Sequence, residues 1–296
     1  MPCYHPVQAW RKSDGVIIFK ASRAGGSPLK LPCGQCIGCR LRRSREWAVR
    51  SVHEAQMHEE NSFITLTYSD DFLPEHSTLV PRHFDLFMKK LRKAIEPRQV
   101  RYYMCGEYGE NFGRPHYHAI LFGLDFPDKE VHQRTSKGIT WVSPFLAQLW
   151  GMGFCTVGAV TFESAAYCAR YVIKKQLGKK AAAHYTKIDR DTGEVIHRVP
   201  EYARMSRRPG LGSDWIEKYV DDVYPSDCVI LRGRPYEVPG FYDRRLAARA
   251  PQALEAIKAE RVAYAESHEA NNTRARLAVR EKVQVSKLKL LKRELA

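Results

Sequence analysis

The chain has 296 residues, of which 44% are hydrophobic, so it is long and apolar enough to bury a core and is not disordered. Lysine and arginine number 48 against 33 aspartate and glutamate, a formal net charge of +15 that favours a polyanionic partner. No apolar run approaches the roughly 20 residues that cross a bilayer, and the N-terminus lacks the apolar stretch of a secretory signal. We therefore expect a nucleic acid rather than a membrane as partner, and a cytosolic location.

A cluster of cysteines lies near the N-terminus. Three of the eight cysteines, Cys33, Cys36 and Cys39, fall within seven residues, which is typical of a metal site rather than of a disulfide framework in a chain this long. With Cys3 or His5 as the fourth ligand, the set is suited to a structural Zn²⁺. Iron–sulfur proteins also use such spacings, and free thiols are the third possibility. Three other cysteines are expected to be small buried residues of strands or helices: Cys105, Cys155 and Cys168.

The composition divides the chain into four segments. Residues 1–60 form a Cys-rich, zinc-binding segment with a short β-like run at 15–20 and a basic helix over 40–60. Residues 61–180 form a core with a regular hydrophobic pattern. Residues 181–242 form a basic extension, with a hairpin over 187–196 and a turn at 206–210. Residues 243–296 are rich in Ala, Leu, Lys and Arg, contain no Gly, and predict a basic helical tail.

The core segment predicts a small sheet. Strands are expected over 63–68, 100–107, 116–122 and 154–162, where β-branched and aromatic residues are bounded by turn signals. Helical spacing of apolar residues predicts helices over 81–95, 144–150 and 165–177, the last capped by Ser164 and ended by Gly178. The order β-α-β-β-α-β-α predicts an α+β fold of the ferredoxin-like plan, an antiparallel sheet with helices on one face.

The sharpest motif is the pair His116 and His118 on the third predicted strand. Alternate residues of a strand point to one face, so the two imidazoles can share one metal ion. A hairpin through residues 109–113 brings Glu107 alongside His116, with Glu110 as the substitute ligand. A carboxylate with two histidines suits a divalent cation such as Mg²⁺ or Mn²⁺ that keeps positions open for substrate oxygens. The alternative is a pair of ordinary core or surface histidines.

A second motif lies on the helix predicted after the fourth strand. Tyr167, Tyr171 and Lys174 fall within about 60° of one another around its axis, opposite an apolar face of Ala166, Ala169, Val172 and Ile173. The two hydroxyls are expected one turn, about 6 Å, apart. A phenol with a pKa near 10 is a poor nucleophile unless a metal-polarised phosphate and a nearby lysine activate it. The motif therefore predicts a tyrosine transesterase, with Tyr171, nearer Lys174, as the first nucleophile and Tyr167 as the second.

Together these motifs resemble the HUH superfamily of endonucleases. The chain has a strand (FITLTY), a histidine strand (GEYGENFGRPHYHAILFG) and a tyrosine helix (YCARYVIKK) in the order of that superfamily. It is most similar to replication initiators of the Microviridae, small phages with single-stranded DNA. The segments MPCYHP, LPCGQCIGCRLRRSREWAVR and RMSRRPGLG resemble the gokushovirus branch, and the likeness covers residues 1 to about 215. One departure is Tyr117, an aromatic residue between the two histidines.

The resemblance implies a viral rolling-circle replication initiator that acts in the host cytoplasm. One tyrosine would attack the origin plus strand, leaving a 5′-phosphotyrosine link and a free 3′-OH for the polymerase. The second tyrosine would allow another cleavage, and rejoining would close the circle without ATP. Implied partners are single-stranded and origin DNA with the host helicase and polymerase. From the charge we expect the basic ends, residues 40–50 and the tail after Arg244, to hold the DNA through its phosphates. The alternatives are a non-enzymatic zinc-containing DNA-binding protein and a metal-dependent hydrolase that uses water.

Overall fold

The computed structural model describes residues 2–20, 26–109, 112–136, 138–169, 179–188, 192–224 and 226–290. The chain divides into two compact units, one of residues 1–43 with 256–293 and the other of residues 44–255 with 294–296. Within the described part of the chain, no helix is both long and apolar enough to span a membrane.

The first unit is built from both ends of the chain. Its three-stranded antiparallel sheet has the order β2-β1-β3, with β1 at Val7–Arg11, β2 at Ile17–Ile18 and β3 at Ser27–Leu31. The run expected at 15–20 is thus observed as the short strand β2. Helix α1 (Ile37–Ala55) begins in this unit, and α10 (Arg274–Lys289) lies in it after the short helix η3 (Glu269–Asn272).

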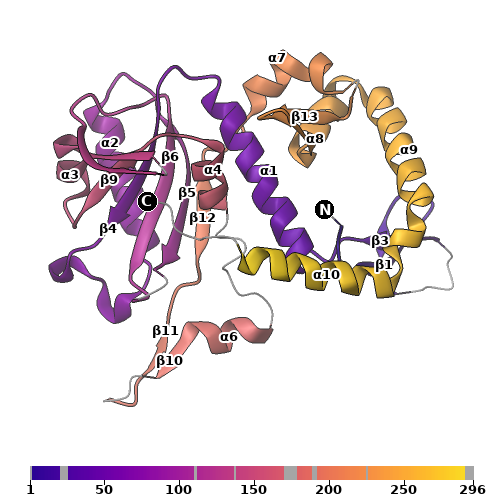
Figure 1. The fold of residues 1–296 in the computed structure, drawn as a ribbon, viewed down its shortest axis with the longest axis horizontal. Helices are drawn as coiled ribbons and strands as arrows, with labels where there is room; N and C mark the ends of the chain where they lie inside the picture. Colours follow the sequence, from indigo (N-terminus) through magenta and orange to yellow (C-terminus); the bar gives the residue numbers. More distant parts are fainter. Residues whose placement is uncertain are drawn as a thin grey trace. The chain divides into compact units, whose positions relative to one another are not determined.

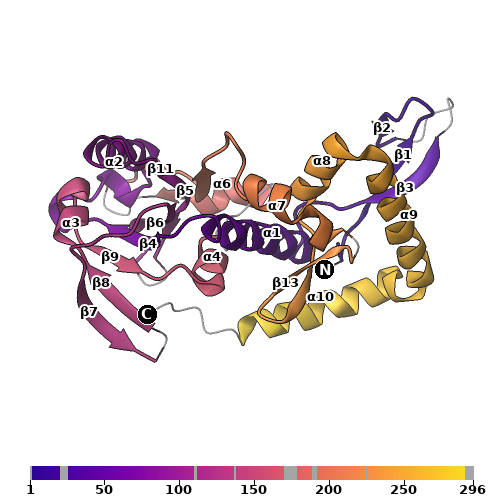
Figure 2. The same ribbon diagram turned by 90° about the horizontal axis from the view of Figure 1, so that it is seen from above.

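The second unit contains a seven-stranded sheet of order β12-β5-β6-β4-β9-β8-β7, in which every neighbouring pair is antiparallel. The prediction of an α+β fold with an antiparallel sheet is confirmed. Strands β12 and β7 are the two edges of the sheet. Hairpin β7–β8 forms one end of the sheet (Figure 2). The strands are β4 (Asn61–Thr67), β5 (Arg101–Tyr108), β6 (Pro115–Phe122), β7 (Glu130–Thr135), β8 (Gly138–Val142), β9 (Cys155–Gly158) and β12 (Tyr202–Met205).

Helices cover both faces of this sheet, so the prediction of helices on one face is wrong. Helices α2 (Pro81–Ala94) and α3 (Pro144–Trp150) lie on one side, and α4 (Phe162–Ala169) lies on the other, where α1 also packs (Figure 1). The reason is visible in β6, whose residues 117–122 are all buried. Alternate side chains of a strand face opposite ways, so a strand buried at every position needs cover on both faces.

The predicted helix boundaries shift for local reasons. Helix α4 begins at Phe162 rather than 165, because Thr161 and not Ser164 precedes its first turn. The backbone N–H of Ser164 donates to Oγ1 of Thr161 at 3.1 Å, and the Ser164 hydroxyl accepts from the N–H of Thr161 at 2.8 Å, a reciprocal cap. Helix α1 ends at Ala55 rather than 60, where the side-chain amide of Asn61 donates to the carbonyls of Ala55 and His58.

Beyond residue 178 the structure is more regular than expected. The hairpin predicted over 187–196 is confirmed as β10 (Thr186–Ile188) and β11 (Val195–His197), which follow α6 (Lys179–Tyr185). Helix α7 (Ser213–Val223) and a second hairpin, β13 (Cys228–Leu231) with β14 (Arg234–Glu237), were not expected. The tail predicted to be helical consists of α8 (Gly240–Arg249), α9 (Pro251–Ser267) and α10 in its described part.

Candidate functional site

The pairing of β5 with β6 brings the predicted metal ligands together. Glu107 lies directly opposite His116 in the antiparallel ladder, and Cys105 lies opposite His118. Since residues two apart share a face, Glu107, His116 and His118 all point to the face covered by α4. Their ligand atoms lie within 4.8 Å of one another, so the structure places the predicted set at one point.

The carboxylate of Glu107 is the centre of this group. Its side chain is 1% exposed, and its Oε1 lies 3.2 Å from Nε2 of His116 and 3.4 Å from Nε2 of His118. The hydroxyl of Tyr167 donates to the same oxygen at 2.9 Å. A buried carboxylate is costly unless it is paired or coordinates a metal, and three polar groups converge on this one.

The Nδ1 atoms of His116 and His118 are hydrogen-bonded, and these bonds decide whether the Nε2 atoms can bind a cation. Nδ1 of His116 donates to the carbonyl of Arg114 at 3.1 Å, because a carbonyl oxygen can only accept. In neutral His116, Nε2 then carries a lone pair that faces the Glu107 oxygen, so the pair is repulsive unless a positive charge intervenes. Nδ1 of His118 forms a hydrogen bond with the hydroxyl of Thr65 at 3.0 Å. Metal-binding histidines are commonly oriented in this way through their second nitrogen.

The spacing also fits a small divalent cation. Adjacent ligands of an octahedral ion with bonds of about 2.1 Å lie about 3 Å apart. The distances of 3.2 and 3.4 Å from Glu107 to the two histidines are close to this value. One carboxylate with two neutral imidazoles would leave a dication with net positive charge, which favours the binding of a phosphate. The residues present therefore fit Mg²⁺ or Mn²⁺.

Tyr167 is the helix residue at this centre. Its ring packs edge-on against His118, with centroids 4.8 Å apart, and Phe63 stacks on the same imidazole at 5.6 Å. Burial, and then the negative charge of Glu107, raise the pKa of the Tyr167 phenol above its usual range. The hydroxyl thus remains protonated at neutral pH unless a nearby cation offsets these two effects.

The face of α4 differs in part from the prediction. The buried residues of the helix are Ser164, Ala165, Cys168 and Ala169, whereas Ala166 is only partly buried. The expectation that Cys105, Cys155 and Cys168 are buried is confirmed. The predicted residues Tyr171, Lys174 and the substitute ligand Glu110, like Val172 and Ile173, lie outside the described residues.

Tyr117 points away from the site, which accounts for an aromatic residue between the two histidines. Its ring is fully buried in the core under α2 and α3. The hydroxyl donates to the carbonyl of Val80 at 2.8 Å, accepts from the Val80 N–H at 3.1 Å and lies 2.9 Å from the hydroxyl of Tyr68. The size and polarity of this side chain are therefore satisfied on the opposite face of the sheet.

Sequence reasoning missed two residues that support the site, Thr65 and Phe63. Both lie on β4, where Thr65 pairs with His118 and Phe63 with Ile120. The signal was present in the alternation of FITLTY, because Phe63 and Thr65 share a face. The missing information was the register that joins this strand to β6.

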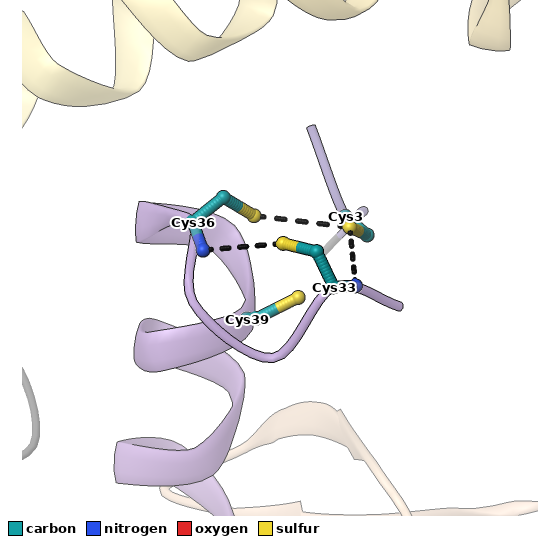
Figure 3. Close-up of side chains that lie close together, drawn as sticks. All are labelled: Cys3, Cys33, Cys36 and Cys39. Atoms are coloured by element: carbon teal, nitrogen blue, oxygen red, sulfur yellow. Dashed lines mark hydrogen bonds between the residues drawn. The ribbon is translucent and has the colours of Figure 1, made fainter. Parts of the chain in front are cut away.

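The four cysteines of the N-terminal cluster also come together. The sulfur atoms of Cys3, Cys33, Cys36 and Cys39 lie within 4.8 Å of one another and point toward a common centre (Figure 3). Burial raises the pKa of Cys36, but hydrogen bonds from the backbone amides of Cys39 and Tyr4 and from the side chains of Cys39 and Cys33 together outweigh this effect and lower it to about 7. His5, the alternative fourth ligand, instead bonds Glu281 at 2.8 Å.

The basic helix 40–50 is divided between solvent and core. Arg42 and Arg43 are exposed, as expected for residues that contact phosphates. Arg50 is only 6% exposed, and its Nε donates to the carbonyl of Leu211 at 3.0 Å. Its guanidinium lies 4.3 Å from the ring centroid of Trp47. The expectation that Arg50 contacts DNA is therefore wrong, because its side chain is used inside the fold.

Comparisons with known proteins agree on one family. Residues 61–176 match the family model of the replication-associated protein ORF2/G2P, a stretch that contains all four groups of the Glu107 site. The chain is 34% identical to the replication-associated protein VP4 of Bdellovibrio phage phiMH2K, over 82% of this chain and 76% of that protein. It is 36% identical to the replication-associated protein ORF2 of Spiroplasma virus 4, over 73% and 67% of the two chains. The replication-associated protein ORF4 of Chlamydia phage 1 is 30% identical, over 72% of this chain and 52% of that protein. No solved structure matches.

Proposed function

Since this chain belongs to the family of phage replication-associated proteins, we propose that it starts rolling-circle replication by cutting the plus strand at the viral origin. The observation that carries the proposal is the hydroxyl of Tyr167, 2.9 Å from Oε1 of Glu107. A nucleophile in contact with a candidate metal ligand is the arrangement that a tyrosine transesterase needs.

Glu107, His116 and His118 are assigned to hold Mg²⁺ or Mn²⁺. Such an ion would polarise the scissile phosphate and lower the pKa of a neighbouring phenol. Thr65 and the carbonyl of Arg114 hold the two imidazoles with Nε2 toward Glu107. Burial of the carboxylate excludes water that would otherwise weaken its interactions.

The cleavage step is a transesterification. The phenol oxygen of the attacking tyrosine, Tyr171 or Tyr167, attacks phosphorus, the bond from phosphorus to the 3′ oxygen breaks, and overall the phenol proton passes to that oxygen. The products are a 5′-phosphotyrosine ester and a free 3′-OH, so no water and no ATP are consumed. Attack of a 3′-OH on the ester reverses the step, which rejoins the displaced strand into a circle.

Tyr171 and Lys174 are assigned to the same reaction. In a continuous helix, Tyr171 follows Tyr167 by about one turn, so the two phenols would reach one phosphate in alternate rounds. Lys174, three residues after Tyr171, would stabilise the phenolate or the charge on the pentavalent phosphate. Tyr171 is the proposed first nucleophile and Tyr167 the second. The contact of the Tyr167 hydroxyl with Glu107 supports the alternative, in which Tyr167 attacks first.

The proposed partners follow from charge and from the reaction. The net charge of +15 suits single-stranded and origin DNA bound through phosphates. The free 3′-OH is a substrate for the host polymerase, and a host helicase would separate the strands. Together these partners place the proposed reaction in the host cytoplasm. The division into segments 1–60, 61–180, 181–242 and 243–296 stays a prediction.

The test is covalent capture of DNA. The protein is incubated with Mn²⁺ and a single-stranded origin oligonucleotide labelled at its 3′ end, because the fragment 3′ of the cut stays on the tyrosine. A denaturing gel should show a labelled protein band that is absent with EDTA. His118→Ala should give no band while DNA affinity is largely retained, because distributed Lys and Arg side chains carry binding.

Variants of the two tyrosines identify the nucleophile. Tyr167→Phe and Tyr171→Phe should each keep some adduct but fail to complete repeated rounds, and the double variant should form none. Tyr264→Phe, at an exposed position of α9, is the matched control and should behave as the parent protein. An adduct in the double variant would place the nucleophile elsewhere. Tight DNA binding without any adduct would favour the non-enzymatic zinc-containing DNA-binding protein.

A further inference from the structure

The Cys cluster of the first unit has the geometry of a tetrahedral metal site. A zinc ion with four bonds to sulfur of about 2.3 Å holds its sulfurs about 3.8 Å apart. The sulfurs of Cys3 and Cys36 are separated by 3.8 Å, and all four sulfurs lie within 4.8 Å. The thiols come from three places in the chain: the N-terminal segment, the loop before α1, and the start of α1 (Figure 3).

The backbone around the sulfurs is arranged to stabilise thiolates. The N–H of Cys33 donates to the sulfur of Cys3 at 3.2 Å, and the N–H of Cys36 donates to the sulfur of Cys33 at 3.3 Å. The N–H of Tyr4 donates to the sulfur of Cys36 at 3.3 Å. Amide donors of this kind orient metal ligands and offset the negative charge that four thiolates bring to one ion.

The first unit has little else to hold it together. Among its described residues, the buried apolar side chains are Tyr4, Ala9, Cys36 and Leu277. Small domains with so small a core usually depend on a disulfide or a structural metal. The cysteines of this cluster are free thiols, so a disulfide does not supply the link.

The cluster also lies where the two ends of the chain meet. Tyr4, Cys36 and Leu277 form one buried cluster, and the other three cysteines and Ile37 pack against it. The side chain of His5, two residues after Cys3, bonds Glu281 of α10 at 2.8 Å. Fixing Cys3 against α1 therefore also fixes the surface on which α10 packs.

We propose that Cys3, Cys33, Cys36 and Cys39 bind one structural Zn²⁺, and that this ion holds the N-terminal segment, the start of α1 and helix α10 together as one unit. Four protein thiolates leave no position open, so the site has no part in strand cleavage. Loss of the ion should release Cys3 from α1 and, through the Tyr4–Leu277 contact, loosen α10.

The experiment is elemental analysis of the full chain purified without chelator. The protein analysed is the double variant His116→Ala/His118→Ala, because these changes remove any zinc bound at the Glu107 site. We expect about one zinc and no iron per chain in this double variant. Adding Cys33→Ser should lower the zinc content to near zero, whereas Cys228→Ser, a half-buried cysteine of β13 outside the cluster, should leave it unchanged.

A second measurement covers the case in which Cys33→Ser does not fold. A thiol-specific mercurial added to the double variant should release the zinc, detected with a chelating dye, in proportion to the cluster thiols modified. Limited proteolysis should then cut near α10 sooner than in the untreated protein. Iron in place of zinc, no metal with all four thiols freely reactive, or zinc retained by a folded Cys33→Ser variant would overturn the proposal. None of these readouts uses strand cleavage, so either proposal can fail without the other.

Discussion

The hydroxyl of Thr65 offers a test of how the histidine pair is oriented. It lies 3.0 Å from Nδ1 of His118, and this contact holds the ring with Nε2 toward Glu107. Thr65→Val keeps the shape of the side chain and its place on β4 but removes the hydrogen bond. Loss of such an outer contact typically weakens metal binding 10- to 100-fold, or about 1.4 to 2.7 kcal/mol.

We expect the Mn²⁺ concentration for half-maximal adduct formation to rise by about that factor, with the rate at saturating metal largely retained. Thr156→Val is the matched control, because Thr156 of β9 lies directly opposite Thr65 of β4 and is likewise half-buried. A Thr65→Val protein with the metal dependence of the parent would refute this role of the hydroxyl. An equal loss in Thr156→Val would show that any change on this face of the sheet has the same effect.

Three further predictions concern the stability of the fold and the binding of DNA. Tyr117→Phe should lower the free energy of unfolding in urea by about 1–3 kcal/mol, because it removes the acceptor of the Val80 N–H and one of the two donors to the Val80 carbonyl, yet cleavage by the folded protein should persist. Burial lowers the pKa of His53 to about 3, so the unfolded chain takes up a proton at this residue at a higher pH than the folded protein does. As the pH falls from about 6.5 to 3, the free energy of unfolding should therefore decrease by about 1.4 kcal/mol per pH unit. His53→Gln should flatten that slope when unfolding is measured over this pH range. Arg43→Ala should reduce the salt dependence of DNA binding by about one unit of log–log slope, whereas Arg50→Ala should lower stability and leave the slope unchanged.

The histidine site could be predicted from sequence because it depends on short-range rules. Glu107, His116 and His118 belong to one hairpin, so strand alternation and a short turn determine which side chains meet. The same reasoning predicted β4, β5 and β6 within a few residues of their observed ends. The contact of Tyr167 with Glu107 joins residues 60 apart in the chain. The sequence predicted the helix that carries Tyr167, but not that its hydroxyl contacts Glu107.

The strands that sequence reasoning missed lack the pattern on which it relies. Strand β7 is exposed at five of its six positions, so it shows no alternation of apolar and polar residues. Strand β12 pairs Tyr202 with Gly106, and nothing in its four residues indicates which strand it joins. Pairing between segments so far apart is decided by the packing of the whole sheet rather than by local propensity.

Arg50 and Arg43 illustrate why net charge predicts a partner better than it predicts contacts. Both are arginines of the same basic helix, and composition counts them equally. Arg43 is exposed, whereas Arg50 is buried. The Nε of Arg50 donates a hydrogen bond to the carbonyl of Leu211, which lies 161 residues later in the chain. A buried guanidinium requires such acceptors because desolvation of its charge is otherwise costly. Since part of the +15 charge is used in this way, the surface proposed to bind DNA has to be located by mutation of exposed arginines and not by counting them.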